Sequence, residues 1–419
     1  MKYTVTLLFL ILSSLISFSQ DSLVRFSGSV IDQKTKTPLP YANIALKIRS
    51  IGTTTNENGE FEFKIPQAYL NDTIEINYLG YDVFEQPLSK LKKESTIKLK
   101  PSAFNLKEVV IRPKPPTYYI QIGLENIPEN YPRQAFTGRS YYREWITENQ
   151  NPISYKEAVF KSYFPAYSDT SVKNQHQVML YREPDKLYEV ALNKEKRDKQ
   201  AAKEKRKAEK KGETIDTADA KMIATALSGP QAVLQTDIVH TREIFLDSNY
   251  FKKFIYTFGQ PTTFQGREVM VIHFESKNKV EHTRQQGTLY LDANSYAFIK
   301  YHYDGVLVIP AYIKPVIFLA GYGIENPTFN RSIEYTFRNG NWYPHLIHTN
   351  IDFTLEKKHI FSSNEVSDFN IQQGLLFNQL DLENHDEIPE EKRYDNSKPI
   401  KEQVFNDLNL NWKQINTIR

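Results

Sequence analysis

The stretch Gly52-Thr-Thr-Thr-Asn-Glu-Asn-Gly-Glu-Phe-Glu-Phe63 sets the pattern for the first part of the chain. The β-branched residues Thr53–Thr55 precede a polar run that ends in Gly59, and glycine readily adopts the positive φ that tight loops need. After this turn, Phe61 and Phe63 alternate with glutamates, so the two rings point to the same face of a strand. The stretch therefore predicts a β-hairpin with one buried face.

Similar short runs lie on both sides of this stretch. Each is four to ten residues long, alternates or clusters apolar side chains, and ends at a turn rich in Asn, Asp, Gly or Pro, which is typical of strands. The runs are Phe26–Asp32, Tyr41–Ile48, Thr73–Leu79, Asp82–Leu88 and Ser95–Leu99. Six or seven short strands within residues 24–111 predict a small β-sandwich.

The order of these runs is similar to that of the carboxypeptidase-regulatory-like domain. The segments that carry the resemblance are GSVIDQKTKTPLPYANIAL, GTTTNENGEFEF, DTIEINYLGYD and TIKLKPSAFNLKEVVI, within residues 26–111. The resemblance implies a seven-stranded transthyretin-like β-sandwich of a kind common in exported proteins of Bacteroidetes-type bacteria. It also implies an accessory module rather than a peptidase, because a zinc carboxypeptidase needs a separate catalytic domain.

Residues 1–20, MKYTVTLLFLILSSLISFSQ, predict a secretory signal peptide. One Lys is followed by an apolar run through Ile16 and then by the small residues Ser17 and Ser19, the order of such a signal. The sequence contains no Cys, so neither a lipid-anchoring cysteine nor a disulfide is expected. We expect an exported protein, in the periplasm or associated with the outer membrane, that is not lipid-anchored.

The rest of the chain predicts no transmembrane span after the signal. Its most apolar run, Val306–Ala320, is interrupted by Pro310, Lys314 and Pro315. With 53 Lys and Arg against 50 Asp and Glu, the net charge is +3. This balance argues neither for nor against nucleic acid. No nucleic-acid partner is expected, because the basic segment at residues 193–212 lacks interleaved aromatic residues and the chain is predicted to be exported.

The run Arg112–Pro116 predicts a Pro-rich linker over residues 112–117, followed by a second, antiparallel β-domain over residues 118–395. Its strongest strand signals are Tyr141–Glu148, Ile153–Tyr163, Phe254–Phe258, Glu268–Glu275, Gly287–Leu291, Ala297–Tyr303, Ser332–Arg338 and Trp342–Phe353. The segments GREVMVIHFESKN, GTLYLDANSYAFIKYHY and YTFRNGNWYP resemble the curved half-barrel sheets of periplasmic lipoprotein-carrier-like proteins. The predicted fold class is mainly β, a seven-stranded sandwich followed by a larger curved antiparallel sheet with helical insertions.

Three segments of the second part of the chain predict helices. Residues 193–212 hold ten Lys or Arg and four acids without an apolar stripe, which indicates a solvated helix or a disordered insertion. The alternative is contact with anionic lipid headgroups. That contact would use Lys203, Lys205, Arg206, Lys207, Lys210 and Lys211. Residues Thr217–Leu227 predict a second helix, and residues 396–419 a C-terminal amphipathic helix that docks on its own domain.

The sequence predicts no catalytic, cofactor or metal site. No nucleophile motif is present, and the nine His are scattered. His345 and His348 are three residues apart in an extended segment, which predicts that they lie on opposite faces. The apolar run Val306–Tyr322 is either core or the lining of an acyl-chain site. The aromatic residues that would face a lipid there are Tyr312, Phe318 and Phe329.

We therefore expect an exported, non-enzymatic cell-envelope binding or interaction protein that uses a carboxypeptidase-regulatory-like module. Its partner would be an envelope protein or a lipid, with peripheral contact to the outer membrane. The first alternative is a periplasmic lipid or lipoprotein carrier. The second is a hydrolase of surface glycan or peptide, whose paired carboxylates would meet only in space and leave no sequence motif.

Overall fold

The computed structural model describes residues 22–418 apart from 103–112, 170, 185–186, 193–228 (of which 194 and 199 are described), 279, 281–282, 307–320 (of which 315 is described) and 360–362. The predicted signal peptide, the basic insertion at 193–212 and the predicted helix Thr217–Leu227 thus lie outside the described residues, except for 194 and 199. No helix in the described ranges is long and apolar enough to cross a membrane.

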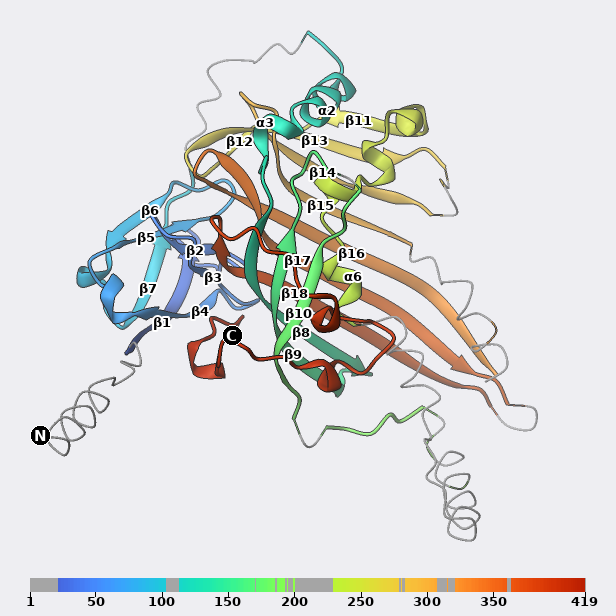
Figure 1. Cartoon of the computed structure of the whole chain (residues 1–419). Coiled ribbons are helices and arrows are strands. Elements are labelled where there is room, and N and C mark those ends of the chain that lie inside the picture. The colour runs from blue at the N-terminus through green and yellow to red at the C-terminus, as the bar shows by residue number, and fades with distance from the viewer. Residues whose placement is uncertain are drawn as a thin grey trace, which may run out of the picture.

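The N-terminal part is a sandwich of two small sheets (Figure 1). One sheet has the order β4-β1-β7 and consists of β1 (Leu23–Asp32), β4 (Glu60–Pro66) and β7 (Glu94–Leu99). The other has the order β3-β2-β5-β6 and consists of β2 (Asn43–Leu46), β3 (Gly52–Thr54), β5 (Thr73–Asn77) and β6 (Phe84–Pro87). Two 3-10 turns, η1 (Gln67–Tyr69) and η2 (Leu88–Lys90), follow β4 and β6. The predicted seven-stranded sandwich is confirmed.

The alternating strand β4 supplies the centre of the sandwich core. Phe61, Phe63 and Ile65 are all 0% exposed, while Glu60 is exposed on the other side of the strand. They pack with apolar residues from both sheets, Ile44 and Ile74 among them. Burying one such side chain contributes about 1.5–3 kcal/mol, so this alternation fixes which face of the strand is inside.

The predicted hairpin around Gly59 is wrong, although its turn is present. The strand before the turn, β3, pairs with β2, and the strand after it, β4, pairs with β1 in the other sheet. The reason lies in Thr53–Thr55, which are all 0% exposed and so do not alternate as a hairpin strand would. The Thr55 hydroxyl donates to the Leu39 carbonyl at 2.7 Å, holding the chain where it crosses between the sheets.

The remaining strands form one large, twisted sheet of eleven strands (Figure 1). Its main order is β10-β9-β8-β18-β17-β16-β15-β14-β13-β11, with β12 paired to β13, and every pairing is antiparallel. The strands are β8 (Phe136–Glu148), β9 (Asn151–Phe164), β10 (Gln175–Arg182), β11 (Phe254–Phe258), β12 (Thr262–Phe264), β13 (Arg267–Ser276), β14 (Gln285–Asp292), β15 (Phe298–Val306), β16 (Tyr322–Arg338), β17 (Asn341–Lys357) and β18 (Glu365–Asp381).

The turns between neighbouring strands follow from local sequence. Asn149 and Gln150 join β8 to β9 with φ values of 48° and 70°. The pair Asn339-Gly340 joins β16 to β17 with φ values of 48° and 87°. Two successive residues with positive φ make the tight turn that matches the twist of a hairpin, and Asn and Gly tolerate this region best. The strands predicted on both sides of these two turns are present.

Short helices cover one face of the large sheet, here called the core face. They are α2 (Pro116–Glu125), α3 (Ile127–Asn130), α6 (Gln231–Leu234), α7 (Ile238–Thr241), η3 (Ile244–Leu246) and η4 (Ser248–Lys253). Tyr119 and Ile120 of α2 join the main apolar cluster beside Tyr301 and Trp342 of the sheet. A second cluster, around Ile351 and other residues of β8, β17 and β18, continues the core face toward the other ends of the strands.

Helix α2 corrects the predicted linker. Residues 112–117 were predicted as a Pro-rich connection, but the helix already begins at Pro116. Proline suits this first position because its fixed φ is helical and its missing N–H has no partner there in any helix. The Pro-rich composition thus marks a helix start as well as a boundary.

A buried polar network lies on the core face at Glu144 of β8, which is 0% exposed. Its carboxylate accepts hydrogen bonds from Tyr142 Oη at 2.7 Å, Gln373 Nε2 at 3.1 Å and the Gly229 backbone N at 2.6 Å. Burial opposes ionisation, but the Lys156 ammonium at 3.2 Å and these hydrogen bonds lower the pKa of Glu144. This network ties the segment before α6 to the sheet, and Gln373 Oε1 is its buried atom without a hydrogen-bond partner among the described residues.

The C-terminal amphipathic helix predicted over residues 396–419 is wrong. The tail instead contains two short 3-10 turns, η6 (Ile400–Gln403) and η7 (Trp412–Gln414), after η5 (Glu390–Lys392). Its backbone covers the edge of β10, where Phe405 N donates to the Val178 carbonyl at 2.8 Å. Extended backbone makes such edge contacts and a helix cannot, because a helix uses these groups internally. The predicted docking of the tail is confirmed by Ile415 (0% exposed) and Ile418 (3% exposed).

The sandwich packs directly on the face of the large sheet opposite the core face (Figure 1). The Leu380 N–H, near the C-terminal end of β18, donates to the Ser50 carbonyl at 3.0 Å. The backbone amide of Gly80 donates to Thr263 of β12 at 2.8 Å. Asn416 in the tail exchanges two hydrogen bonds with the Lys64 backbone, at 2.7 and 3.1 Å. The sandwich, the sheet and the tail thus share one continuous interface.

Candidate functional site

The face of the large sheet opposite the core face is called the outer face here. One row of side chains crosses nine neighbouring strands on the part of this outer face that the sandwich leaves uncovered. Each member stands directly opposite the next in the register of the sheet, and we call the set the polar row. Its members are Tyr155, Trp145, Gln372, Asn350, Asn330, Asp304, Gln286, Glu275 and Ile255. Strands lie about 4.8 Å apart, so eight intervals give the row a length of about 38 Å.

The pleat of the strands explains why these side chains share a face. The chain neighbours of row members point the other way and are buried, as Ile146, Ile351 and Tyr303 are at 1%, 4% and 1% exposure. Since successive residues alternate between faces, burial of one set leaves the other set outside. Trp145 is 39% exposed, an unusual position for so large an aromatic ring.

A second row runs parallel to the first, two residues along each strand and nearer the sandwich. We call it the histidine row, and it consists of His348, Ser332, His302, Thr288, His273 and Thr257. Imidazoles alternate with hydroxyls along it, and His273 Nδ1 lies 2.9 Å from Thr288 Oγ1. Burial and the nearby Lys300 ammonium lower the pKa of His302, which favours its neutral form.

Hydrogen bonds hold the amides and carboxylates of the face in place. Gln286 Nε2 donates to Asp304 at 3.1 Å within the polar row. Asn370 Nδ2 donates to Asn350 Oδ1 and to Asp352 Oδ1, both at 2.7 Å. These side chains are therefore oriented before any ligand arrives, which lowers the entropic cost of binding.

Charge on the two rows has one sign. Glu275 and Asp304 are the charged members, and neither row contains Lys or Arg. The chain as a whole carries 53 such residues, so their absence from these 15 positions is distinctive. Positive charges next to the polar row include those of Lys277 and Arg284, which line a hollow beside it.

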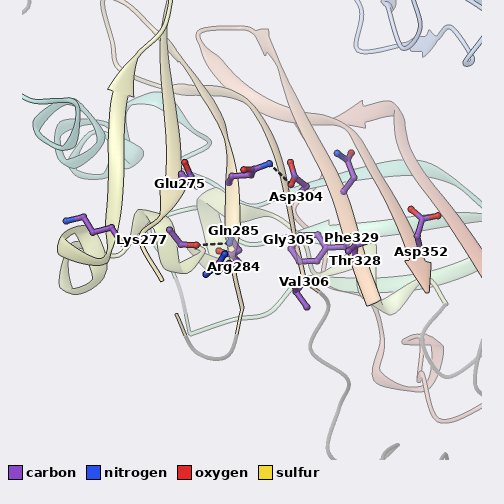
Figure 2. A pocket seen from close by; sticks show the side chains of 13 residues that line it. Glu275, Lys277, Arg284, Gln285, Asp304, Gly305, Val306, Thr328, Phe329 and Asp352 are labelled. Carbon is purple, nitrogen blue, oxygen red and sulfur yellow. Dashed lines mark hydrogen bonds between the residues drawn. The ribbon is translucent and has the colours of Figure 1, made fainter. Parts of the chain in front are cut away.

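A hollow of about 510 Å³ lies along one half of the polar row (Figure 2). Figure 2 shows its lining strung across the strands, from Glu275 and Lys277 at one side to Asp352 at the other. Its floor includes Asp304, Gly305 and Thr328. Most of the residues that line this hollow are polar or charged, Arg284 among them, and the only large aromatic ring in its described lining is that of Phe329.

The sandwich forms a wall beside the rows. Glu57, in the turn that precedes β4, accepts a hydrogen bond from Arg143 at 2.8 Å, and Arg143 stands two residues from Trp145. Tyr41 Oη lies 3.2 Å from His348 Nε2. Burial lowers the pKa of His348 to about 4, so its imidazole is neutral at pH 7.

The predicted arrangement of the two close histidines is wrong. His348 contacts Tyr41, and His345 lines a small hollow with Asn43 of the sandwich, so both face the N-terminal domain. The cause is a β-bulge, because Glu334 pairs with Leu346 while the next residue pairs with Pro344. A bulge adds one unpaired residue and resets the alternation of faces. No group of three His, Asp or Glu within the described ranges is arranged to hold a metal ion.

The predicted lipid-facing residues are only partly described. Tyr312 and Phe318, like the basic residues between 203 and 211, lie outside the described residues. Phe329 is half-buried, lines the hollow, and packs edge-on against Tyr303 at 5.5 Å between ring centroids. Of the three, Phe329 is the one among the described residues, and its role toward a lipid stays a prediction.

Sequence reasoning missed the polar row itself. A signal was present in β18, where Asp368, Asn370 and Gln372 alternate with Phe369 and Ile371. That alternation indicates a strand with a polar outer face, but it does not say which strands lie beside it.

Comparison with known proteins identifies the first domain. Residues 26–111 match the family model of the CarboxypepD_reg-like domain. The sandwich is therefore a carboxypeptidase-regulatory-like domain, as its sequence indicated. The match covers the N-terminal domain alone, and the large sheet makes up most of the remaining chain. A comparison with curated protein sequences gives no match.

Comparison with solved structures gives distant likenesses. A LolA superfamily protein from Nitrosomonas europaea is 9% identical, with 66% of this chain and 98% of that chain covered and a TM-score of 0.22. A DUF1329 family protein from Desulfovibrio piger is also 9% identical, with 62% and 91% covered and a TM-score of 0.21. At these TM-scores neither likeness carries an argument about function.

Proposed function

We propose that this protein is a non-enzymatic cell-envelope binding protein that holds its ligand on the polar row. The observation that carries the proposal is the continuity of that row, from Tyr155 on β9 to Ile255 on β11. The amides and carboxylates of the face are already oriented by hydrogen bonds to each other. A long, oriented polar surface suits an extended ligand that lies across the strands.

Binding accounts for this face better than catalysis does. Enzymes commonly close around the reacting atoms and exclude water, which strengthens electrostatic interactions there. Glu275, Asp304 and Asp352 instead lie along an open hollow on the sheet surface. The hydrolase alternative would need two of them to approach one scissile bond. The envelope location rests on the predicted signal peptide at residues 1–20.

The carboxypeptidase-regulatory-like domain would act as a rigid side wall of this site. It is fixed to the large sheet by the Arg143–Glu57 ion pair at 2.8 Å and by backbone hydrogen bonds such as Gly80 to Thr263. Domains joined by a large interface move little relative to one another. The wall would therefore limit the ligand to the uncovered half of the face.

Site-specific photo-crosslinking in the native cells tests the proposal. A benzophenone amino acid replaces Gln372 in one variant and Gln286 in another, because both side chains are exposed members of the row. The control carries it at Ile48, which is 83% exposed on the sandwich. Benzophenone reacts with C–H bonds of any organic ligand. We expect an adduct from both row positions and none from the control, and equal yields at all three would refute the proposal.

The lipid-carrier alternative makes a different prediction. An acyl chain needs an apolar pocket, and the run Val306–Tyr322 that suggested one is mostly outside the described residues. Native mass spectrometry of protein purified from its own envelope fraction separates the two ideas. A co-purifying mass that disappears on delipidation would favour the carrier.

A further inference from the structure

The polar row also indicates what class of ligand it binds. Building on the function proposed above, we infer that the ligand is an uncharged polyhydroxylated chain, a glycan, and that Trp145 stacks on one of its sugar rings. Three features of the face carry this inference: its hydrogen-bonding groups, its charge and its aromatic end.

The hydrogen-bonding groups of the two rows match hydroxyls. A sugar hydroxyl both donates and accepts, so it needs donors and acceptors close together. Gln372, Asn350 and Asn330 each offer an amide that does both, and a neutral imidazole such as that of His302 offers one of each. The Asn330 amide lies 3.5 Å from His302 Nε2, so donors and acceptors of the two rows are interleaved.

The charge of the two rows favours a neutral ligand over an anionic one. Lys277 and Arg284 line the hollow beside the polar row, but no member of either row is an ionic partner for phosphates, nucleic acids or anionic headgroups. Glu275 and Asp304 accept hydrogen bonds from hydroxyls as well as from amides. A neutral, hydroxyl-rich chain therefore fits the face without an uncompensated charge.

The aromatic end supplies the apolar contact that sugar rings need. Trp145 and Tyr155 pack edge to face, with ring centroids 5.3 Å apart and an interplanar angle of 80°. This contact holds the indole at a fixed angle while leaving it 39% exposed. The C–H groups on one side of a pyranose ring can pack against such a face, since aromatic surfaces are negative over the ring and attract C–H hydrogens.

The shape of the face fits a chain better than a protein partner or a small molecule. Small-molecule sites are concave and mostly apolar, and they bury most of the ligand. Protein interfaces have apolar, desolvated centres with few charged groups. Between Trp145 and Ile255 the row contains six successive amides and carboxylates and no large apolar side chain. A ligand about 38 Å long would engage all of them.

The crosslinked adducts from position 372 identify the ligand class directly. They are purified, hydrolysed in acid and analysed for monosaccharides, amino acids and fatty acids. We expect neutral sugars bound to the protein. In a Trp145→Ala background the yield should fall about tenfold, whereas Trp145→Phe should keep most of it.

Matched controls separate this inference from the function on which it rests. Phe405→Ala removes an aromatic ring of similar exposure, 41%, from the tail, and its adduct yield should equal that of the parent. Adducts that contain peptide or fatty acid but no sugar would overturn the glycan while leaving a binding face. Sugar adducts that survive Trp145→Ala unchanged, with the melting temperature unaltered, would overturn the stacking role. Absence of any adduct at the row would overturn both proposals.

Discussion

Protonation of His345 at the interface between the two domains is expected to weaken the folded state. This side chain is 3% exposed, lies among Asn43, Arg338 and Thr336, and its Nε2 has no hydrogen-bond partner among the described residues. Burial lowers its pKa from 6.5 to about 3, helped by the positive charge of Arg338. The folded protein therefore keeps the imidazole neutral where the unfolded chain would protonate it.

The magnitude follows from the difference in bound protons. Above pH 6.5 His345 is mostly neutral in both the folded and the unfolded protein, so its titration does not change the unfolding free energy. As the pH falls below 6.5 the unfolded chain binds one proton more, so stability decreases by about 1.4 kcal/mol per pH unit until the folded pKa is reached. Between pH 6.5 and pH 5.0 this amounts to about 2 kcal/mol. Burial also lowers the pKa of His176 and His348 to about 4, so each adds to the slope.

Urea unfolding at several pH values between 5.0 and 6.5 measures this slope. Paired carboxylates such as Glu57 contribute mainly below this window, because their pKa values lie lower. Relative to the wild type, the unfolding free energy of His345→Gln should change less with pH, by about 1.4 kcal/mol per pH unit. His385→Gln, at an exposed position, controls for loss of an imidazole. Equal slopes for His345→Gln and wild type would refute the reasoning.

Three further substitutions test how the fold is held together. Phe63→Ala, at a site that is 0% exposed between the two small sheets, should lower the unfolding free energy by about 3–5 kcal/mol in urea titrations; a loss below about 1 kcal/mol would contradict the packing described. Glu144→Ala should cost about 3–5 kcal/mol because it leaves Lys156 and buried donors without their acceptor, and calorimetry should show a lower Tm. Ile418→Asp should release the tail, since Ile418 Cδ1 packs over Gly374, and the tail should then be cut faster in limited proteolysis than in wild type.

Much of the fold was predictable from local pattern. The alternation of Phe61, Phe63 and Ile65 fixed a buried face, and the sandwich and the large antiparallel sheet were both expected. These features depend on neighbouring residues, whose periodicity and turn chemistry act at short range. The errors share a different origin. The supposed hairpin at Gly59 and the C-terminal helix were decided by pairing with strands distant in sequence, and the faces of His345 and His348 by a β-bulge between β16 and β17.

The candidate site shows the same contrast between what local sequence predicts and what strand pairing decides. The sequence alone determined that Asn370 and Gln372, or Asn350 and Asp352, lie on the polar sides of their strands, because the residues between them are apolar. Only the tertiary structure decided that Trp145, Gln372, Asn350 and Glu275 form one row, since strand order and register place residues more than 200 positions apart side by side. Register is selected by the burial of the opposite face across the whole sheet, and no local segment contains that information.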